Sequence, residues 1–274
     1  MIGVVQRHAP GARVLEVGCG TGVLACVAAR AGAREVWAVE PTAQAELAAA
    51  VVRENGLEGV VHVRRARIED LPPREVDFAF AEVLNADPFA EGVVPVMAAA
   101  ARWVRPGGRL APARLRVWAC LVRAGGSARE ARAADAELVR IARAADLNLD
   151  RVRESLAGPA DYRNIGAREV VAGPSAPVWD LDLRAGVAPE AVTRALTVDE
   201  AGPVAGVLVW FEAELDEAAC LGNPPGAGGH WGQLVCQWAE ERGMRAGEQV
   251  AVRVALEHDG VHATRAAASG VGRT

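Results

Sequence analysis

The sequence predicts an α/β fold in which a parallel, doubly wound domain is followed by an antiparallel β domain. Strand-like apolar runs alternate with helical segments over residues 1–110, which is the pattern of a parallel sheet covered by helices. Residues 127–154 then have a helical composition rich in Ala, Arg and Glu, and short β-type runs separated by Gly, Pro and Asp follow them. We therefore expect a Rossmann-like domain over residues 1–112 and a β-barrel-like domain over 113–274, with a helical arm at 125–165.

Apolar runs and glycine turns place the individual elements. Strands are expected at 13–18, 34–40, 60–64 and 76–81, and helices at 23–31, 44–55 and 95–104. Gly18, Gly20 and Gly22 form the turn after the first strand. Pro106-Gly107-Gly108 is expected to break the last helix before a long strand at 115–123. Strands of the second domain are expected at 178–184, 206–215, 232–237 and 249–256.

The composition argues against several classes of function. A net charge of −5 and a pI near 5.7 do not suit a nucleic-acid-binding surface, which needs a basic patch. The amino terminus lacks the pattern of a signal peptide, and no apolar run approaches the ~18–20 residues that span a bilayer. The five cysteines show neither CxxC spacing nor a Cys/His cluster, so we expect free, buried thiols, no metal site and a cytoplasmic protein without membrane contact.

A glycine-rich loop follows the first predicted strand. It reads Gly18-Cys19-Gly20-Thr21-Gly22, and Glu16 precedes it within the strand. Glycines let the backbone approach a ligand closely, and the helix that follows offers free N–H groups. Such a loop alone is weak evidence, because dinucleotide-binding enzymes use a related one. The form (L/V)(D/E)xGxGxG resembles that of class I S-adenosylmethionine-dependent methyltransferases.

Two further segments fit the same cofactor. Glu40 ends the second predicted strand, with Pro41 after it, and a carboxylate there can accept hydrogen bonds from both ribose hydroxyls. The alternative for Glu40 is a strand-end acid that caps a helix. Ile68 and Glu69 follow the third strand, where the methyltransferases that the loop resembles bracket the adenine.

A pair of glutamates lies downstream of the glycine loop. Glu82 and Glu91 are nine positions apart in AEVLNADPFAEG. A guanidinium carries five N–H donors in a fixed fork, and two converging carboxylates can hold it bidentately. The loop follows a parallel strand, at whose carboxyl end α/β proteins bind ligands, which argues against the alternative that both are ordinary loop acids.

Taken in order, VLEVGCGTGVLACVAARAGAREVWAVEP, AEVLNADPFAEG and GGHWGQLVCQW resemble the protein arginine methyltransferases over nearly the whole chain. The resemblance implies that Glu82 and Glu91 form the "double-E" loop of that family, and that His230 and Trp231 match its Thr-His-Trp loop without the Thr. It also implies that the arm makes a dimer. Only Met1–Gly11 precede the first strand, so the family's N-terminal lid helices are expected to be missing, supplied by another chain or lost to a misplaced start.

The resemblance implies an S-adenosylmethionine-dependent arginine N-methyltransferase, with Glu82, Glu91 and His230 as its catalytic residues and Trp231 binding substrate. The acceptor would be an arginine-containing protein, a peptide or free arginine, and the enzyme would be a homodimer. Two alternatives remain open at this point. One is a methyltransferase of the same fold that acts on a different small molecule, and the other is a non-catalytic scaffold subunit.

Overall fold

The computed structural model describes residues 1–123, 160–163, 171–226, 231–258 and 260–266. The chain divides into two compact units. The first unit comprises Met1–Arg116, Asp180–Ala188 and Glu212–Gly222. The second comprises Val117–Trp179, Pro189–Phe211 and Asn223–Thr274. The first unit therefore includes two segments from the region predicted as the second domain.

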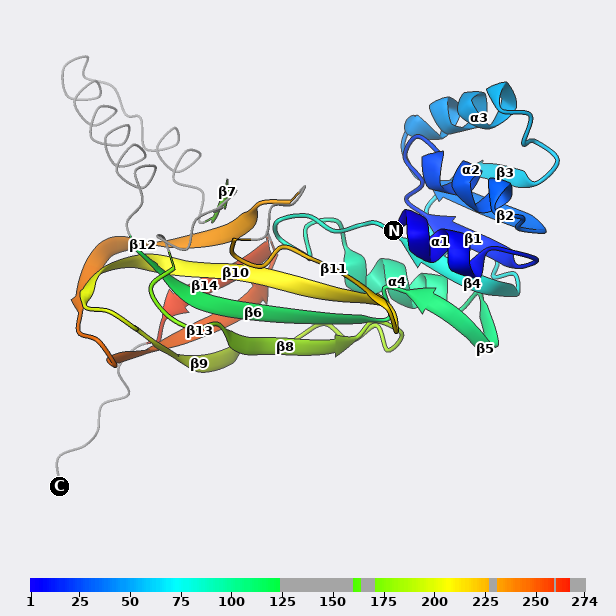
Figure 1. The fold of residues 1–274 in the computed structure, drawn as a ribbon. Helices are drawn as coiled ribbons and strands as arrows, with labels where there is room; N and C mark the ends of the chain where they lie inside the picture. Colours follow the sequence, from blue (N-terminus) through cyan, green and yellow to red (C-terminus); the bar gives the residue numbers. More distant parts are fainter. Residues whose placement is uncertain (124–159, 164–170, 227–230, 259, 267–274) are drawn as a thin grey trace, which may run out of the picture. The chain divides into compact units, whose positions relative to one another are not determined.

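The first unit contains a parallel sheet with the strand order β3-β2-β1-β4-β5 (Figure 1). Its strands are β1 (Arg13–Val17), β2 (Glu35–Glu40), β3 (Val61–Arg65), β4 (Val76–Ala81) and β5 (Val104–Ala111). Its helices are α1 (Ile2–His8), α2 (Val23–Arg30), α3 (Gln44–Glu54), the 3-10 turn η1 (Ile68–Asp70) and α4 (Val93–Ala101). The alternation of strands and helices agrees with the doubly wound pattern that the sequence predicts.

Strand β1 lies between β2 and β4 and sets the edge where a ligand would bind. Val17 pairs with Val39 of β2 on one side and with Ala81 of β4 on the other. Val14 and Leu15 are fully buried, because both faces of a parallel sheet are covered. The carboxyl ends of β1, β2 and β4 therefore meet at one edge, and the residues that follow them are brought together.

Two local predictions differ from the structure. Pro106-Gly107-Gly108 lies inside β5 and does not end a helix, since α4 stops at Ala101. The β4–β5 pairing shifts register between Val76 and Phe78, and such a bulge tolerates a proline without an N–H and a glycine, Gly107, with φ of +79°. Helix α1 was also missed, because its seven residues contain only a short apolar pattern.

The other strands form two antiparallel sheets. One has the order β7-β12-β10-β6-β8 with β11 paired to β10, and the other has the order β14-β13-β9. Their bounds are β6 (Arg114–Arg123), β7 (Ala160–Arg163), β8 (Ala176–Asp182), β9 (Val192–Thr197), β10 (Gly202–Asp216), β11 (Ala219–Gly222), β12 (Gln233–Met244), β13 (Gln249–Glu257) and β14 (Gly260–Arg265). The four predicted strands correspond to β8, β10, β12 and β13. Apart from β7, the predicted arm at 125–165 lies outside the described residues.

The second unit has its own apolar core. Trp118 and Trp210 stack with ring centroids 5.4 Å apart and an interplanar angle of 9°. Cys120 and Leu208 are buried in the same cluster, and the indole N–H of Trp210 donates to Ser175 Oγ at 2.9 Å. These contacts fix β6 and β10 against each other, so the sheet can serve as a rigid support for the loops at its edge.

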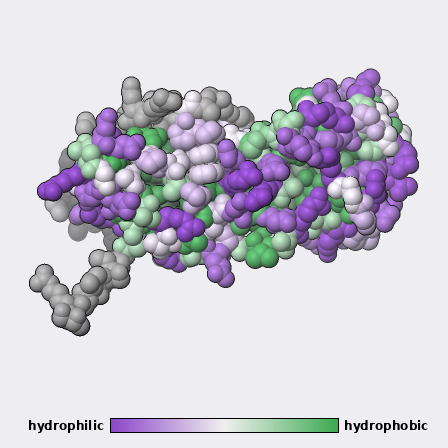
Figure 2. Space-filling model, turned by 60° about the horizontal axis from the view of Figure 1, so that its bottom comes forward, coloured by the Kyte–Doolittle hydropathy of each residue, from purple (hydrophilic) through white to green (hydrophobic). Residues whose placement is uncertain are grey.

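The outer surface is mixed in character. In the view of Figure 2, hydrophobic side chains on the region of β1–β5 occur in small groups among hydrophilic ones. Within the described part of the chain, no helix has the length and apolar content needed to cross a membrane. All five cysteines lie in that part and are free, and the prediction that all are buried was wrong for Cys220, which is exposed, and for Cys26, which is only partly buried.

Candidate active site

The glycine loop connects β1 to α2 through backbone conformations that only glycine adopts easily. Gly18, Gly20 and Gly22 have φ of +70°, +51° and +77°. Space is also limiting, because a Cβ on Gly18 would lie 3.0 Å from Val83 Cγ1 and one on Gly22 would lie 3.1 Å from Ala48 Cβ. The loop is therefore compact, and Val83, the residue after Glu82, packs directly on it.

Glu40, at the end of β2, ties this loop to the next one. Its Oε2 accepts a hydrogen bond from Gly20 N at 3.0 Å, and its Oε1 accepts from Thr42 N at 3.0 Å and Thr42 Oγ1 at 2.6 Å. Burial acts to raise the pKa of Glu40, but these hydrogen bonds outweigh it and hold the pKa below its usual value. None of the three bonds goes to a helix N-terminus, and a carboxylate has about four acceptor sites, so Oε2 keeps capacity for a ligand. Pro41 follows and is exposed.

Glu16, in β1, has a contrasting environment. The residue is 3% exposed, and its Oε2 is buried without a hydrogen-bond partner among the described residues. Burial raises the pKa of Glu16 from 4.5 to about 8, and the charges of Glu82 and Glu40 act in the same direction against a hydrogen bond from the Ala25 backbone. A buried carboxyl oxygen without a partner is costly. Glu16 is therefore the residue in this unit that most needs a partner from outside the chain.

The remaining predicted cofactor residues are Cys19, Ile68 and Glu69, and their surroundings differ. Cys19 is buried within the loop, and burial, followed by the charges of Glu16 and Glu40, raises the pKa of its thiol to about 12. It is thus a small packing residue and not a nucleophile. Ile68 is buried in η1, whereas Glu69 is half-buried and lies 3.6 Å from the Arg67 guanidinium.

Glu82 and Glu91 lie at the two ends of the loop that connects β4 to α4. Glu82 directly follows β4, and Glu91 precedes Gly92, whose φ of +71° starts α4. Both glutamates are exposed. The loop between them is anchored by four buried apolar residues, Val83, Leu84, Ala86 and Phe89. Asp87 is buried and accepts from Phe89 N at 2.9 Å, and Asn85 Nδ2 donates to Glu91 Oε1 at 3.4 Å.

His230 lies outside the described residues. Trp231 belongs to the second unit, where it precedes β12, and its ring lies 5.8 Å from that of Phe211 at an interplanar angle of 55°. The structure thus brings together Glu16, Glu40 and the glycine loop within the first unit. The Glu82–Glu91 loop packs on the glycine loop through Val83.

Comparison with known proteins covers both the sequence and the fold. Residues 14–108 match a family model described as a methyltransferase domain. Protein arginine N-methyltransferase PRMT10 of Arabidopsis thaliana is 38% identical over 115 residues, which is 41% of this chain and 30% of that protein. Protein arginine N-methyltransferase 6 of Xenopus tropicalis is 36% identical over 115 residues, covering 40% of this chain and 34% of that protein. Over these residues the chain is similar to protein arginine N-methyltransferases.

Solved structures of protein arginine methyltransferases extend the likeness of fold to the whole chain. The PRMT1 enzyme–prozyme heterotetrameric complex with AdoHcy from Trypanosoma brucei has a TM-score of 0.78 at 21% identity, covering 97% of this chain and 89% of that one. The open conformation of PRMT10 from Arabidopsis thaliana has a TM-score of 0.76 at 22% identity, covering 98% and 89%. The predicted fold class is confirmed. The sequence matches span only about 30% of the length of the curated relatives.

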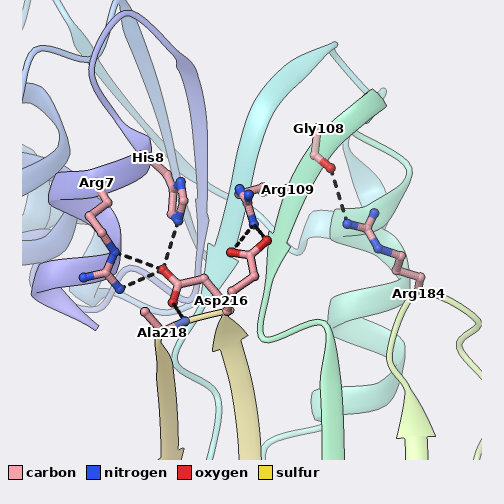
Figure 3. A network of polar contacts seen from close by, with 8 residues as sticks. Arg7, His8, Gly108, Arg109, Arg184, Asp216 and Ala218 are labelled. Carbon is pink, nitrogen blue, oxygen red and sulfur yellow. Dashed lines mark hydrogen bonds and ion pairs between the residues drawn. The ribbon is translucent and has the colours of Figure 1, made fainter.

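One polar network of the first unit was not predicted from the sequence. Figure 3 shows Arg7 and His8 pointing from α1 toward Asp216 at the end of β10. Asp216 Oδ2 accepts from Arg7 Nη2 at 2.7 Å and lies 3.0 Å from His8 Nε2, and Oδ1 accepts from Ala218 N at 2.9 Å. Burial acts to raise the pKa of Asp216, but the hydrogen bonds from Arg7, Ala218 and His8 outweigh it and hold the pKa below its usual value. The 208 positions between His8 and Asp216 leave no local sequence signal.

The described residues contain no group of His, Cys, Asp and Glu that could hold a metal ion. Two buried amides of the second unit, Asn223 and Gln233, were also missed, and each is 1% exposed. A buried side-chain amide is uncommon, but single-sequence reasoning cannot tell a buried amide from an exposed one in a Gly/Pro-rich segment.

Proposed function

We propose that this chain is an S-adenosylmethionine-dependent N-methyltransferase whose acceptor is an arginine guanidinium in a protein, a peptide or the free amino acid. The observation that carries the proposal is the packing of the Glu82–Glu91 loop on the glycine loop, through Val83 and Gly18. A pair of carboxylates therefore flanks a segment that touches the cofactor loop. The similarity of the chain to a protein arginine N-methyltransferase, and of its fold to a PRMT1 complex with AdoHcy, supports the proposal.

Three features of the first unit support a site for the cofactor, which supplies an electrophilic methyl group when bound. The backbone of Gly18, Gly20 and Gly22 leaves room for close approach of a ligand. Glu40 would accept hydrogen bonds from ribose hydroxyls through the free capacity of its Oε2. Glu16, with its unpartnered buried oxygen, would receive a positively charged group. Pro41, Ile68 and Glu69 would line the adenine end.

Glu82 and Glu91 would hold the acceptor. A guanidinium is always protonated and its positive charge is delocalised. Carboxylates that bind one edge draw the charge toward that edge and leave the other nitrogen more nucleophilic. They also fix the line of approach, and positioning of this kind can contribute ~7–11 kcal/mol to lowering a barrier. In this proposal His230 is a further catalytic residue and Trp231 binds the substrate, as the resemblance implies.

A direct assay separates this function from its two alternatives. The full chain is incubated with labelled S-adenosylmethionine and, separately, an Arg/Gly-rich peptide, free arginine and a lysine-for-arginine copy of the peptide. Label on the arginine acceptors alone supports the proposal. Titration calorimetry with S-adenosylhomocysteine accompanies the assay. Binding without transfer to any arginine favours a methyltransferase for a different small molecule, and the absence of binding favours a scaffold subunit.

We further propose that the active form is a cytoplasmic homodimer made through the arm at 125–165. Its support in the described residues is an apolar face on the first unit. Ile2, Val23 and Leu47, on α1, α2 and α3, are each about half exposed. A hollow of about 540 Å³ lies among the same helices, lined in part by Val23, Val27 and Val51. An exposed apolar face of this kind suits an interface.

The dimer has its own test. Light scattering at micromolar concentration is expected to give twice the chain mass for the parent. Val23→Glu places a charge in the hollow and is expected to shift the mass toward that of one chain, whereas the exposed Val187→Glu serves as the matched control. A parent of single-chain mass contradicts the dimer.

A further inference from the structure

Two amide side chains are buried at the place where β12 begins. Asn223 and Gln233 are each 1% exposed. A side-chain amide has two donors and an acceptor, and burying it without partners is unfavourable. Its presence in a fully buried position therefore points to a fixed set of hydrogen bonds that apolar residues could not supply.

The hydrogen bonds of Asn223 join three segments of the second unit. Its backbone N donates to Phe211 O at 3.2 Å, and its Oδ1 accepts from Phe211 N at 2.8 Å. Its Nδ2 donates to Gly232 O at 2.7 Å. Gln233 closes the set, since its Nε2 donates to the backbone oxygen of Asn223 at 2.9 Å.

These hydrogen bonds lie beyond the end of the β10–β12 ladder and replace its backbone hydrogen bonds. In the β10–β12 pairing, the last matched residues at this end are Val209 and Leu234. Phe211 lies two residues farther along β10, and its N–H is satisfied by the Asn223 side chain. The same side chain reaches Gly232, on the β12 side. One amide thus bridges the gap that opens between the two strands beyond their pairing.

Trp231 lies next to this bridge in two ways. It directly precedes Gly232, whose carbonyl is held by Asn223. Its ring also packs on Phe211, with centroids 5.8 Å apart, and Phe211 is the residue whose backbone exchanges two hydrogen bonds with Asn223. The backbone next to Trp231 and the ring on which Trp231 packs are therefore both held by the Asn223 amide.

We infer that Asn223 and Gln233 are positioning residues that fix the Trp231 indole and, through it, the fit of the arginine acceptor. The second half of this inference rests on the proposed function, because it takes Trp231 to face the acceptor. Neither amide needs to touch the acceptor. Their neutral hydrogen bonds can fix the indole without adding charge to a site meant for a cation.

The first test reads the position of Trp231 directly and needs no activity. The full chain is labelled with 5-fluorotryptophan, and the ¹⁹F signal of Trp231, one of seven tryptophans, is assigned from its loss in Trp231→Phe. Gln233→Met removes the hydrogen bond to Asn223 O at nearly constant volume, and Asn223→Ala removes the bridge. Each is expected to shift or broaden the Trp231 signal and leave the tryptophans of the first unit, Trp37 and Trp103, unchanged.

A matched control keeps this test specific. Gln249 is exposed, and its Nε2 donates to Thr197 Oγ1 at 3.2 Å. Gln249→Met is expected to leave the Trp231 signal in place. If Asn223→Ala does not fold, Gln233→Met still decides the question. A folded Gln233→Met protein with an unaltered Trp231 signal overturns the inference.

The second test reads the consequence for the acceptor. Loss of one hydrogen bond is expected to raise the KM for an arginine peptide by about three- to tenfold, with kcat changed less and the Kd for S-adenosylhomocysteine unchanged. A general loss of fold would change all three. If the parent methylates no arginine acceptor, the proposed function fails and the ¹⁹F result alone decides the positioning. An unaltered KM beside a shifted Trp231 signal overturns the link to the acceptor.

Discussion

Glu16 and Glu40 lie at the same edge of one sheet as Glu82 and Glu91, yet the two pairs of acids have opposite environments. Glu16 and Glu40 are buried, and their pKa values are displaced in opposite directions by burial and by hydrogen bonds. Glu82 and Glu91 are exposed at the two ends of an anchored loop. The buried pair takes its pKa shifts from the fold, and of the exposed pair Glu82 acts on Glu16 by helping to raise its pKa. Substitutions in the two pairs should therefore separate stability from function.

The largest effect is expected at the exposed pair. Glu82→Gln and Glu91→Gln keep shape but remove a charge, and each is expected to lower turnover by about 100-fold or more, as does loss of a charge-stabilising group in other enzymes. The melting temperature should equal or exceed that of the parent, because exposed acids kept for function often cost stability. Methyl transfer and thermal unfolding are measured on the same preparations. Glu58→Gln, an exposed acid ahead of β3, is the control. Near-parent turnover removes that glutamate from the clamp.

The contribution of the buried Glu16 to stability should depend on pH. Since its pKa is raised from 4.5 to about 8 in the fold, its contribution to stability is most favourable below pH 4.5, declines as the pH rises toward 8, and is constant above that. Glu16→Gln removes this dependence, so the stability of the variant relative to the parent should rise by about 4–5 kcal/mol between pH 4 and pH 9. Urea unfolding at both pH values measures it, and a constant difference contradicts the buried, unpartnered state.

Glu40 should affect ligand and loop together. Glu40→Ala removes the acceptor for Gly20 N and Thr42, and with it one charge-assisted contact pair to the ribose. The Kd for S-adenosylhomocysteine is expected to rise about 10- to 100-fold, corresponding to ~1.5–3 kcal/mol. Titration calorimetry measures it, with Glu46→Ala on the exposed face of α3 as control. An unchanged Kd would show that Glu40 serves the loop alone.

The smallest effect is expected away from both pairs, at Asp216. Because its pKa is held low in the fold, its stabilising contribution is present above its ordinary pKa of 3.8 and is lost as the pH falls through the folded value. Asp216→Asn is expected to lower the free energy of unfolding by about 1–2 kcal/mol at pH 7 and by less at pH 3. Glu217→Gln, beside it but exposed, is the control. Equal costs at the two pH values contradict a charge-based contact.

The sequence was sufficient where the determinants are local. The glycine loop, the acids at the ends of β1 and β2, and the Glu82–Glu91 loop follow from residues within a few positions of one another, and periodicity located β4 to the residue. It was insufficient where a long-range partner decides the outcome. Pro106-Gly107-Gly108 reads as a helix stop, but pairing with β4 makes it part of β5. The partners of Asp216 and Asn223 depend on which strands meet, and a single sequence does not contain that information.

The attachment of α1 to Asp216 has a consequence for how the chain is made. Arg7 and His8 are synthesised well before their carboxylate partner, which comes 208 positions after His8. Contacts between residues so distant in sequence form late, because a long loop must close first. On the ribosome, the amino-terminal helix can bury Val4 and Val5 against its neighbours early. Its polar side must wait until Asp216 has been translated, so that α1 completes its contacts long after its own residues are made.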